Sequence, residues 1–248
     1  MIVGILGVGH LAASLLAGLK RAGLPSKSIL LSPRGRSGEL AALYDLEICA
    51  DVRDLVHRSD LVLLAVRPQD APAAVDGLAW RPEQVLISVC AGVRLSSLPA
   101  GPARLVRAMP LTAAEINASP TVFFPDIPEA RWLIEQVGPA IALRSEREFE
   151  IATVNAAIYG WAQTLVKQSA EWCAAHGTDP QTMRQLVAQT FVGAGRLIAE
   201  KDQPMEDMLA ELVTPGGITE LGLKVLGERG QPDAWRDACD AVLARLTG

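Results

Sequence analysis

Short apolar runs alternate with amphipathic segments over the first part of the chain. The apolar runs, which predict buried strands, are Met1–Leu6, Ser28–Leu31, Leu61–Val66, Val85–Val89, Ala103–Met109 and Thr121–Phe124. Segments with helical spacing lie between most of these runs, at residues 10–22, Gly38–Tyr44, Val52–Arg58 and Gln69–Leu78. Strands that alternate with helices in this way indicate a parallel sheet with helices on both faces.

The pattern changes after about Arg144. Amphipathic segments then follow one another without strand-like runs, at Glu146–Ala175, Pro180–Ala199, Pro204–Leu212, Ile218–Arg229 and Pro232–Leu246. We therefore predict an α/β domain over residues 1–145 and an all-α domain over residues 146–248.

Composition and charge exclude some classes of function. Half of the 248 residues are hydrophobic and 21% are charged, so the chain can bury enough apolar surface to fold compactly. The formal net charge of −5 and the aromatic content of 4% argue against nucleic-acid binding, which needs a basic face and stacking side chains.

The apolar N-terminus has the composition of a secretory signal or a membrane anchor but not the pattern of either. Its basic residues, Lys20 and Arg21, follow the apolar run instead of preceding it, and three glycines fall within the first nine residues. We expect this stretch to be part of the folded domain of a cytoplasmic protein that makes no membrane contact.

The cysteines and histidines do not have the spacing of a metal site. Cys49, Cys90, Cys173 and Cys239 lie tens of residues apart with no CxxC pair, and only three histidines are present. We expect no bound metal, and reduced thiols in a cytosolic protein.

A glycine-rich turn joins the first predicted strand to the first predicted helix. Residues Gly7, Gly9 and Ala12 fit the pattern GxGxxA, with His10 and Leu11 between them. In this pattern the first glycine makes the tight turn, the second lets a pyrophosphate approach the backbone, and the small third residue lets helix and strand pack closely. The motif predicts dinucleotide binding at the helix N-terminus, with His10 facing the coenzyme; the alternative is a tight turn without a ligand.

The end of the second predicted strand favours NADP over NAD. An NAD site places a carboxylate about 20 positions after the glycines, where it binds the ribose hydroxyls. Here Ser32, Arg34 and Arg36 occupy that region, and no carboxylate occurs before Glu39. The two arginines are candidates for binding a 2′-phosphate, so we expect NADPH to be preferred over NADH. The alternative is an exposed basic turn.

Two later strand ends are expected to complete the coenzyme site, because ligands lie outside the carboxyl ends of parallel strands. The candidate contact residues there are Ala65, Val66, Arg67, Pro68, Ala91 and Gly92.

These features, with two more in the helical half, resemble the pyrroline-5-carboxylate reductase family over nearly the whole chain. The shared segments are the glycine motif, Leu64–Gln69, Ala91–Val93, Arg107–Pro110, Ala188–Thr190 with Gly193 and Ala194, and above all Val213–Thr219. The resemblance implies a Rossmann-type α/β domain followed by an all-α dimerisation domain. It also implies an NAD(P)H-dependent reduction of a C=N bond, in which 1-pyrroline-5-carboxylate becomes proline.

The segment from Thr214 to Thr219 has the chemistry to bind a carboxylate-bearing substrate. Amides of Gly216, Gly217 and Ile218, at the start of a predicted helix, form a candidate carboxylate site that also includes Thr214. The Thr219 hydroxyl is the candidate catalytic group, because it could donate to the imine nitrogen. The alternative is a Pro-Gly loop that joins two helices.

The sequence departs from the family in the region expected to line the substrate pocket. Leu111 follows Pro110 where the family usually has Asn, and Ala157–Ala162 replaces a Gly-Ser-Gly-Pro-Ala-Tyr turn. His10 and Ile218 also differ from the usual residues. The resemblance therefore leaves the identity of the imine substrate and the direction of the reaction open.

Two other readings remain open. A β-hydroxyacid dehydrogenase also has a Rossmann half followed by helices, but its catalytic Lys is followed closely by Asn, and no Asn occurs after Asn155. Lys167 is therefore expected to be a solvated helix residue. The third reading is a non-catalytic NADP-binding sensor or assembly protein.

The first long helical segment carries more apolar residues than one contact face needs. We expect a homodimer or a multiple of it, built by the helical half, as the family resemblance also implies. The residues that suggest it are Ile158, Tyr159, Trp161, Leu165 and Trp172.

Overall fold

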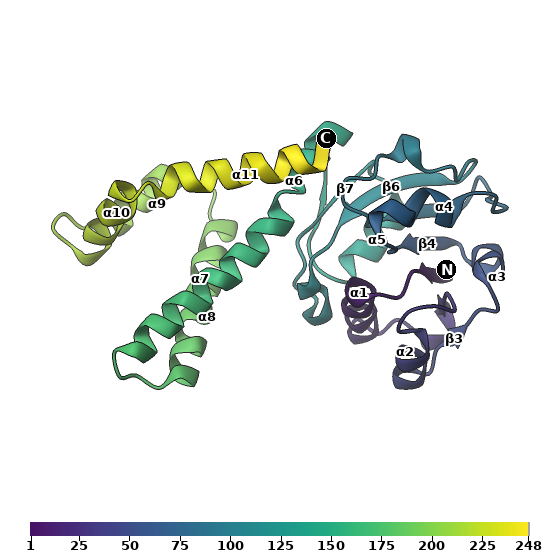
Figure 1. Ribbon diagram of the computed structural model, residues 1–248, viewed down its shortest axis with the longest axis horizontal. Helices are drawn as coiled ribbons and strands as arrows, with labels where there is room; N and C mark the ends of the chain where they lie inside the picture. Colours follow the sequence, from purple (N-terminus) through teal and green to yellow (C-terminus); the bar gives the residue numbers. More distant parts are fainter. Residues whose placement is uncertain (248) are drawn as a thin grey trace. The chain divides into compact units, whose positions relative to one another are not determined.

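The computed structural model describes residues 1–247, which form two compact units (Figure 1). The first comprises Met1–Ala156 and the end of the chain from Leu243, and the second comprises Ala157–Val242. An α/β unit therefore precedes a helical one, as expected. The first unit extends past residue 145 because helix α6 (Glu146–Ala152) packs against strand β7 (Thr121–Phe124).

The first unit is built on an eight-stranded sheet with the order β3-β2-β1-β4-β5-β6-β7-β8. Strands β1 to β6 run parallel, which confirms the predicted arrangement, but β7 pairs with β6 antiparallel and β8 follows the direction of β7. The strands span β1 Val3–Leu6, β2 Ile29–Leu31, β3 Glu47–Ile48, β4 Leu61–Leu64, β5 Val85–Ser88, β6 Arg104–Met109, β7 Thr121–Phe124 and β8 Ala140–Ala142.

Helices cover both faces of this sheet. Alternate strand residues such as Val3 and Ile5 pack against α1, α2 and α5, whereas Val62 and Leu64 pack against α3 and α4 on the opposite face. The helices span α1 His10–Arg21, α2 Ser37–Tyr44, α3 Val52–Arg58, α4 Ala71–Val75, α5 Pro128–Glu135 and α6 Glu146–Ala152. Short 3-10 helices span Ser26–Ser28, Pro68–Asp70, Leu95–Ser97 and Thr112–Ile116.

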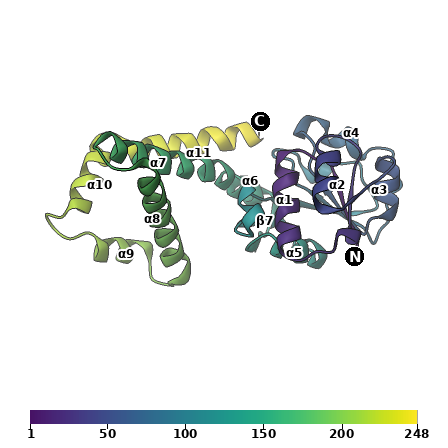
Figure 2. The ribbon, with the colours of Figure 1, turned by 90° about the horizontal axis from the view of Figure 1, so that it is seen from below.

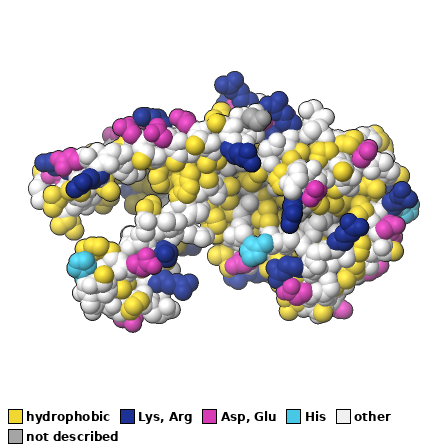
Figure 3. All heavy atoms as spheres, in the orientation of Figure 1, with side chains coloured by type: hydrophobic (Ala, Val, Ile, Leu, Met, Phe, Trp, Pro, Cys, Tyr) yellow, Lys and Arg dark blue, Asp and Glu magenta, His cyan; other side chains and the backbone are white. Residues whose placement is uncertain are grey.

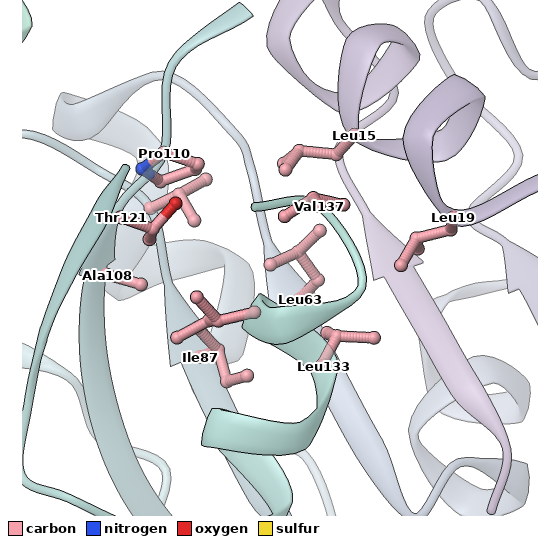
Figure 4. A pocket seen from close by; sticks show the side chains of 11 residues that line it. Leu15, Leu19, Leu63, Ile87, Ala108, Pro110, Thr121, Leu133 and Val137 are labelled. Carbon is pink, nitrogen blue, oxygen red and sulfur yellow. The ribbon is translucent and has the colours of Figure 1, made fainter. Parts of the chain in front are cut away.

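The close-up in Figure 4 shows the core beneath α1 and α5. Leu15 and Leu19 of α1 and Leu133 of α5 surround a cavity of about 20 Å³ that Leu63 and Ile87 of the sheet also line. A space of this size holds at most a water molecule. This cavity is therefore a packing feature of the core and not a ligand site.

The second unit is all helical, as predicted. One difference is that the segment expected as a single helix from Glu146 to Ala175 is divided into α6 and α7, with a turn at Thr153 and Val154. The Thr153 hydroxyl donates to the Phe149 carbonyl at 2.8 Å, and both turn residues are β-branched and buried, which disfavours a continuous helix. The helices span α7 Asn155–Ala175, α8 Pro180–Glu200, α9 Met205–Leu212, α10 Ile218–Glu228 and α11 Gln231–Thr247 (Figure 2).

Candidate active site

The glycine turn connects β1 to α1 at the carboxyl edge of the sheet. Gly7 has φ +92°, and a Cβ there would lie 2.7 Å from the Val66 backbone nitrogen, so this position requires glycine. A Cβ on Gly9 would meet nothing within 4 Å. The first glycine therefore serves the close packing of β1 on the end of β4, and the second leaves the surface beside the helix N-terminus open.

The N-terminus of α1 has the features of an anion site. Gly9 is its N-cap residue and no side chain caps it, so the first amides of the helix have no intrahelical or side-chain acceptor. Ala12 is buried against the sheet, whereas His10 is exposed and Leu11 is half-buried. Uncapped amides and open space beside Gly9 are the two features that the glycine motif needs in order to bind a pyrophosphate at a helix N-terminus.

The loop after β2 is fastened to this turn. The Gly7 amide donates to the Ser32 hydroxyl oxygen at 3.1 Å, and the Arg36 amide donates to the Val8 carbonyl at 2.8 Å. The Ser37 hydroxyl contacts the carbonyls of Ser32 and Arg34, the latter at 2.8 Å. Ser32 is therefore held beside the first glycine with its hydroxyl hydrogen still available to donate.

A groove of about 550 Å³ opens beside the glycine turn. Arg34 lines it, together with Gly7 and Ser32. Arg36 does not; its guanidinium donates to both Glu39 carboxylate oxygens, at 2.9 and 2.6 Å, and this bond lowers the pKa of Glu39. The two predicted phosphate ligands are thus in different situations, with Arg34 at the groove and Arg36 engaged by Glu39.

Asp51 and Asp70 also line the groove, and sequence reasoning missed both. Asp51 accepts from the Asp54 amide at 2.8 Å as the N-cap of α3. An Asp just before an apolar helical segment is a recognisable cap signal, but it does not indicate that the same residue faces a ligand. Carboxylates here can accept hydrogen bonds from the hydroxyl and amino groups of an adenosine.

The other predicted coenzyme residues follow β4 and β5. The Ala65 amide donates to the Leu6 carbonyl at 2.8 Å, and the Cys90 thiol contacts the Val66 carbonyl at 3.4 Å, which ties the two strand ends together. Burial raises the pKa of the Cys90 thiol, so it stays neutral. Of the remaining candidates, Arg67, Pro68 and Gly92 are exposed at this edge and Ala91 is half-buried.

The candidate substrate turn lies in the second unit, before α10. The Gly217 amide donates to the Thr214 carbonyl at 2.8 Å, and the Gly216 amide donates to a Glu220 carboxylate oxygen at 2.7 Å. Two of the three amides expected to bind a carboxylate therefore already have acceptors within the turn. Ile218 is 91% exposed and Thr219 is half-buried.

No group of three or more His, Cys, Asp or Glu side chains that could hold a metal ion occurs within residues 1–247. Among the helices described over the same range, none is long and apolar enough to cross a membrane.

Comparison with known proteins gives matches over both parts of the chain. Residues 2–92 match the family described as "NADP oxidoreductase coenzyme F420-dependent". Residues 146–247 match the pyrroline-5-carboxylate reductase dimerisation family. Pyrroline-5-carboxylate reductase 2 of Bacillus subtilis is 29% identical over 90% of this chain and 86% of its own length. The corresponding reductase of Pseudomonas aeruginosa is 27% identical over 98% of this chain and 94% of its own.

The chain is similar to pyrroline-5-carboxylate reductases over nearly its whole length, and its residues 146–247 match the dimerisation domain of that family.

The crystal structure of the family member from Streptococcus pyogenes has the same fold throughout. It matches with a TM-score of 0.86 at 26% identity, over 99% of this chain and 98% of that one. The expected α/β domain followed by an all-α domain is therefore confirmed. The expected coenzyme, NADP, is confirmed by the match to NADP-dependent oxidoreductases.

The similarity to pyrroline-5-carboxylate reductases over nearly the whole chain weighs against the β-hydroxyacid dehydrogenase interpretation. A 3-hydroxyisobutyrate dehydrogenase of Mycobacterium tuberculosis matches with a TM-score of 0.53 at 14% identity, which shows a shared fold alone. Lys167 is exposed on α7 and forms an ion pair with Glu171 at 3.3 Å, as expected for a solvated residue.

Two of the departures from the family pattern, at Leu111 and at Ala157–Ala162, lie within core and helix. Leu111 is buried in the first unit, and its amide donates to the Ser119 hydroxyl at 2.8 Å. The segment Ala157–Ala162 lies in the first turns of α7, where Tyr159 is half-buried. Both departures therefore lie within regular helix or buried core and do not interrupt the fold.

Proposed function

We propose that this protein is an NADPH-dependent reductase that converts 1-pyrroline-5-carboxylate to proline. The observation that carries the proposal is the full-length similarity to reductases of that name, because it includes both the coenzyme turn and the helical half. The open space at Gly9 and the uncapped α1 amides fit the coenzyme that such a reaction needs.

The coenzyme-binding residues are assigned from their positions around the glycine turn. The amides at the start of α1 hold the pyrophosphate, and Ser32 and Arg34 bind the 2′-phosphate of the adenosine. When bound, NADPH supplies the hydride. The strand ends at Ala65–Pro68 and Ala91–Gly92 support the remainder of the coenzyme.

The substrate is held by the turn before α10. Its carboxylate lies at the positive end of that helix, and the Thr219 hydroxyl donates a hydrogen bond to the imine nitrogen. As hydride adds to the imine carbon, the hydroxyl relays a proton from water to the nitrogen, which becomes the amine of the product. Because the Gly216 amide is bound by Glu220, the substrate carboxylate either displaces that side chain or uses the amides of Ile218 and Thr219.

The helical half assembles as a homodimer or a multiple of it. In α7 to α11 only Ala170 is buried among the residues that the structure describes. Figure 3 shows apolar side chains gathered on the surface of this segment. Exposed large apolar residues of the segment include Leu165, Trp172, Leu186, Phe191, Leu197, Leu209, Leu212, Leu221 and Leu226. A surface of this kind needs a protein partner, and a second copy with the dimerisation-family match supplies one.

Two further expectations stay predictions. One is the division of labour between residues 1–145 for the coenzyme and 146–248 for substrate and dimerisation. The other is a cytoplasmic location, which the free thiols of all four cysteines favour.

Purified protein tests the proposed activity directly. NADPH oxidation is followed with 1-pyrroline-5-carboxylate, with its six-membered piperideine analogue, and with no imine. We expect rapid oxidation with the pyrroline and slower or none with the piperideine. Tight NADPH binding without turnover on either imine would contradict the proposal and favour the sensor reading.

A further inference from the structure

A buried arginine lies near the end of β6, outside the groove already described. The Arg107 side chain is 2% exposed, and the residue pairs in register with Ser88 of β5. Its guanidinium lies over the Phe149 ring of α6, 4.5 Å from the centroid. A charge this far from water is retained only where partners compensate it, so its partners indicate its role.

Glu146, the first residue of α6, connects Arg107 to the loop that follows β5. Its Oε1 atom accepts from Arg107 Nη1 at 2.9 Å and from the Leu95 backbone amide at 2.9 Å. At the other end of the same loop, the Cys90 amide donates to the hydroxyl of Ser88 at 3.4 Å. The loop thus begins beside Arg107, because Ser88 pairs with it in the sheet, and is held again at Leu95 through Glu146.

A second carboxylate, that of Glu150, also contacts Arg107 but accepts no hydrogen bond from the Leu95 amide. Glu150 Oε1 lies 3.5 Å from Arg107 Nη1 and 3.5 Å from Arg94 Nε. Glu146 and Glu150 therefore carry the same charge, lie on the same helix and share Arg107. They differ in that the Leu95 amide is bonded to Glu146.

The loop held in this way contains Ala91 and Gly92. The groove for the adenosine half contains Arg34 and Asp51, from the loops that follow β2 and β3. In the sheet order, β2 and β3 lie on one side of β1, and β4 and β5 lie on the other. A dinucleotide that crosses the glycine turn after β1 therefore extends its nicotinamide half toward the loop after β5.

We propose that Glu146, held by Arg107, positions the 91–92 loop for the nicotinamide half of the coenzyme. This inference rests on the proposed binding of NADPH. Neither residue touches the coenzyme; they are positioning residues that act through the Leu95 amide. Their loss should weaken contacts to the nicotinamide half and leave the contacts of the adenosine and phosphates intact.

Binding titrations with two ligands separate these contacts. The ligands are NADPH and 2′-phospho-ADP-ribose, which lacks the nicotinamide ring. The variants are Glu146→Ala, Glu146→Gln, whose amide oxygen can still accept from Leu95, and the matched control Glu150→Ala. Melting temperatures without ligand report any general loss of stability.

We expect Glu146→Ala to weaken NADPH binding by roughly five- to tenfold, the value of one buried hydrogen bond, and to change the fragment's affinity less than twofold. Glu146→Gln should recover most of the lost affinity. The affinity of Glu150→Ala for each ligand should stay within about twofold of the wild-type value. This should hold even if its melting temperature falls as much as that of Glu146→Ala. An equal loss for both ligands in Glu146→Ala, or the same selective loss in Glu150→Ala, would overturn the inference.

Leu95→Pro removes the donor from the other side and leaves the Arg107–Glu146 ion pair in place, so it serves if Glu146→Ala does not fold. Leu95 begins a 3-10 helix and Arg94 has φ −75° and ψ 150°, a conformation that accepts a following proline. The same selective loss is expected, and unchanged NADPH affinity in Leu95→Pro would contradict the inference. A wild type that binds NADPH but reduces no imine would refute the proposed activity and leave this result standing.

Discussion

The Glu220 carboxylate accepts a hydrogen bond from the Gly216 amide at 2.7 Å, at the turn where a substrate carboxylate is proposed to bind. Both residues lie in the second unit, four positions apart, so the contact is local. A carboxylate of the chain thus occupies an amide that a carboxylate of the substrate would use. Two anions at one helix N-terminus repel each other, which makes Glu220 a competitor of the substrate.

Neutralising this competitor should improve substrate binding. Glu220→Gln retains an oxygen that can accept from Gly216 but loses the negative charge, so we expect KM for the imino acid to fall by about two- to fivefold with little change in kcat. Glu228→Gln is the control, because Glu228 lies on the same helix, pairs with Lys224 at 3.9 Å, and is remote from the turn in sequence. A rise in KM for Glu220→Gln would show instead that the carboxylate maintains the shape of the turn.

The two arginines after β2 should contribute unequally to coenzyme choice. Arg34 lines the groove, whereas Arg36 is held by Glu39, so Arg34→Ala should lower NADPH affinity by about tenfold or more while NADH affinity barely changes. Arg36→Ala should cost less. Titration of each variant with both coenzymes measures this, and equal wild-type affinity for NADH and NADPH would contradict the assignment of a 2′-phosphate site.

Sequence patterns predicted the local features of the coenzyme half well. The strand, glycine turn and helix are set by residues that are neighbours along the chain, and the open space at Gly9 is what the motif requires. The Arg36–Glu39 pair was also within reach of sequence reasoning, because residues three apart at a helix start face each other.

Features that depend on distant residues were not predictable in this way. A short apolar run has no direction, so nothing in Thr121–Phe124 indicated that β7 runs antiparallel to β6. The contact between Arg107 and Glu146 joins positions 39 apart and appears only when α6 packs on the sheet. Glu146 by itself has the pattern of a solvated residue in the first turn of a helix, so its position in the sequence gives no sign of this contact.

The two glycines of the turn should respond differently to alanine. Gly7→Ala forces a Cβ into the backbone of Val66 at a positive φ, so the melting temperature should fall clearly. At Gly9 the Cβ meets only open space, so Gly9→Ala should fold normally and instead obstruct the pyrophosphate. Thermal melting and NADPH titration of both variants test this, and normal coenzyme affinity in Gly9→Ala would place the phosphates elsewhere.

Thr219 should affect turnover and not coenzyme binding. Thr219→Val keeps the shape of the side chain but removes the hydroxyl, so kcat should fall by roughly ten- to a thousandfold if that group assists protonation of the imine nitrogen. Thr219→Ser should retain most activity, and NADPH affinity should be unchanged in both because the glycine turn is untouched. Wild-type turnover in the valine variant would assign the proton to another donor, with Tyr159 or water the next candidates.

The apolar surface of the helical half should require a second copy of the chain. Light scattering should give at least twice the 26.4 kDa of one chain. Two leucines with the same 65% exposure provide matched variants, Leu212 in the helical unit and Leu43 in the α/β unit. Leu212→Glu places a charge in the proposed interface, where desolvation opposes assembly, so it should shift the protein toward the monomer and lower its melting temperature. Leu43→Glu should leave mass and stability unchanged, because its side chain stays in water in either state. A wild-type mass of 26.4 kDa at working concentrations would contradict the proposed homodimer.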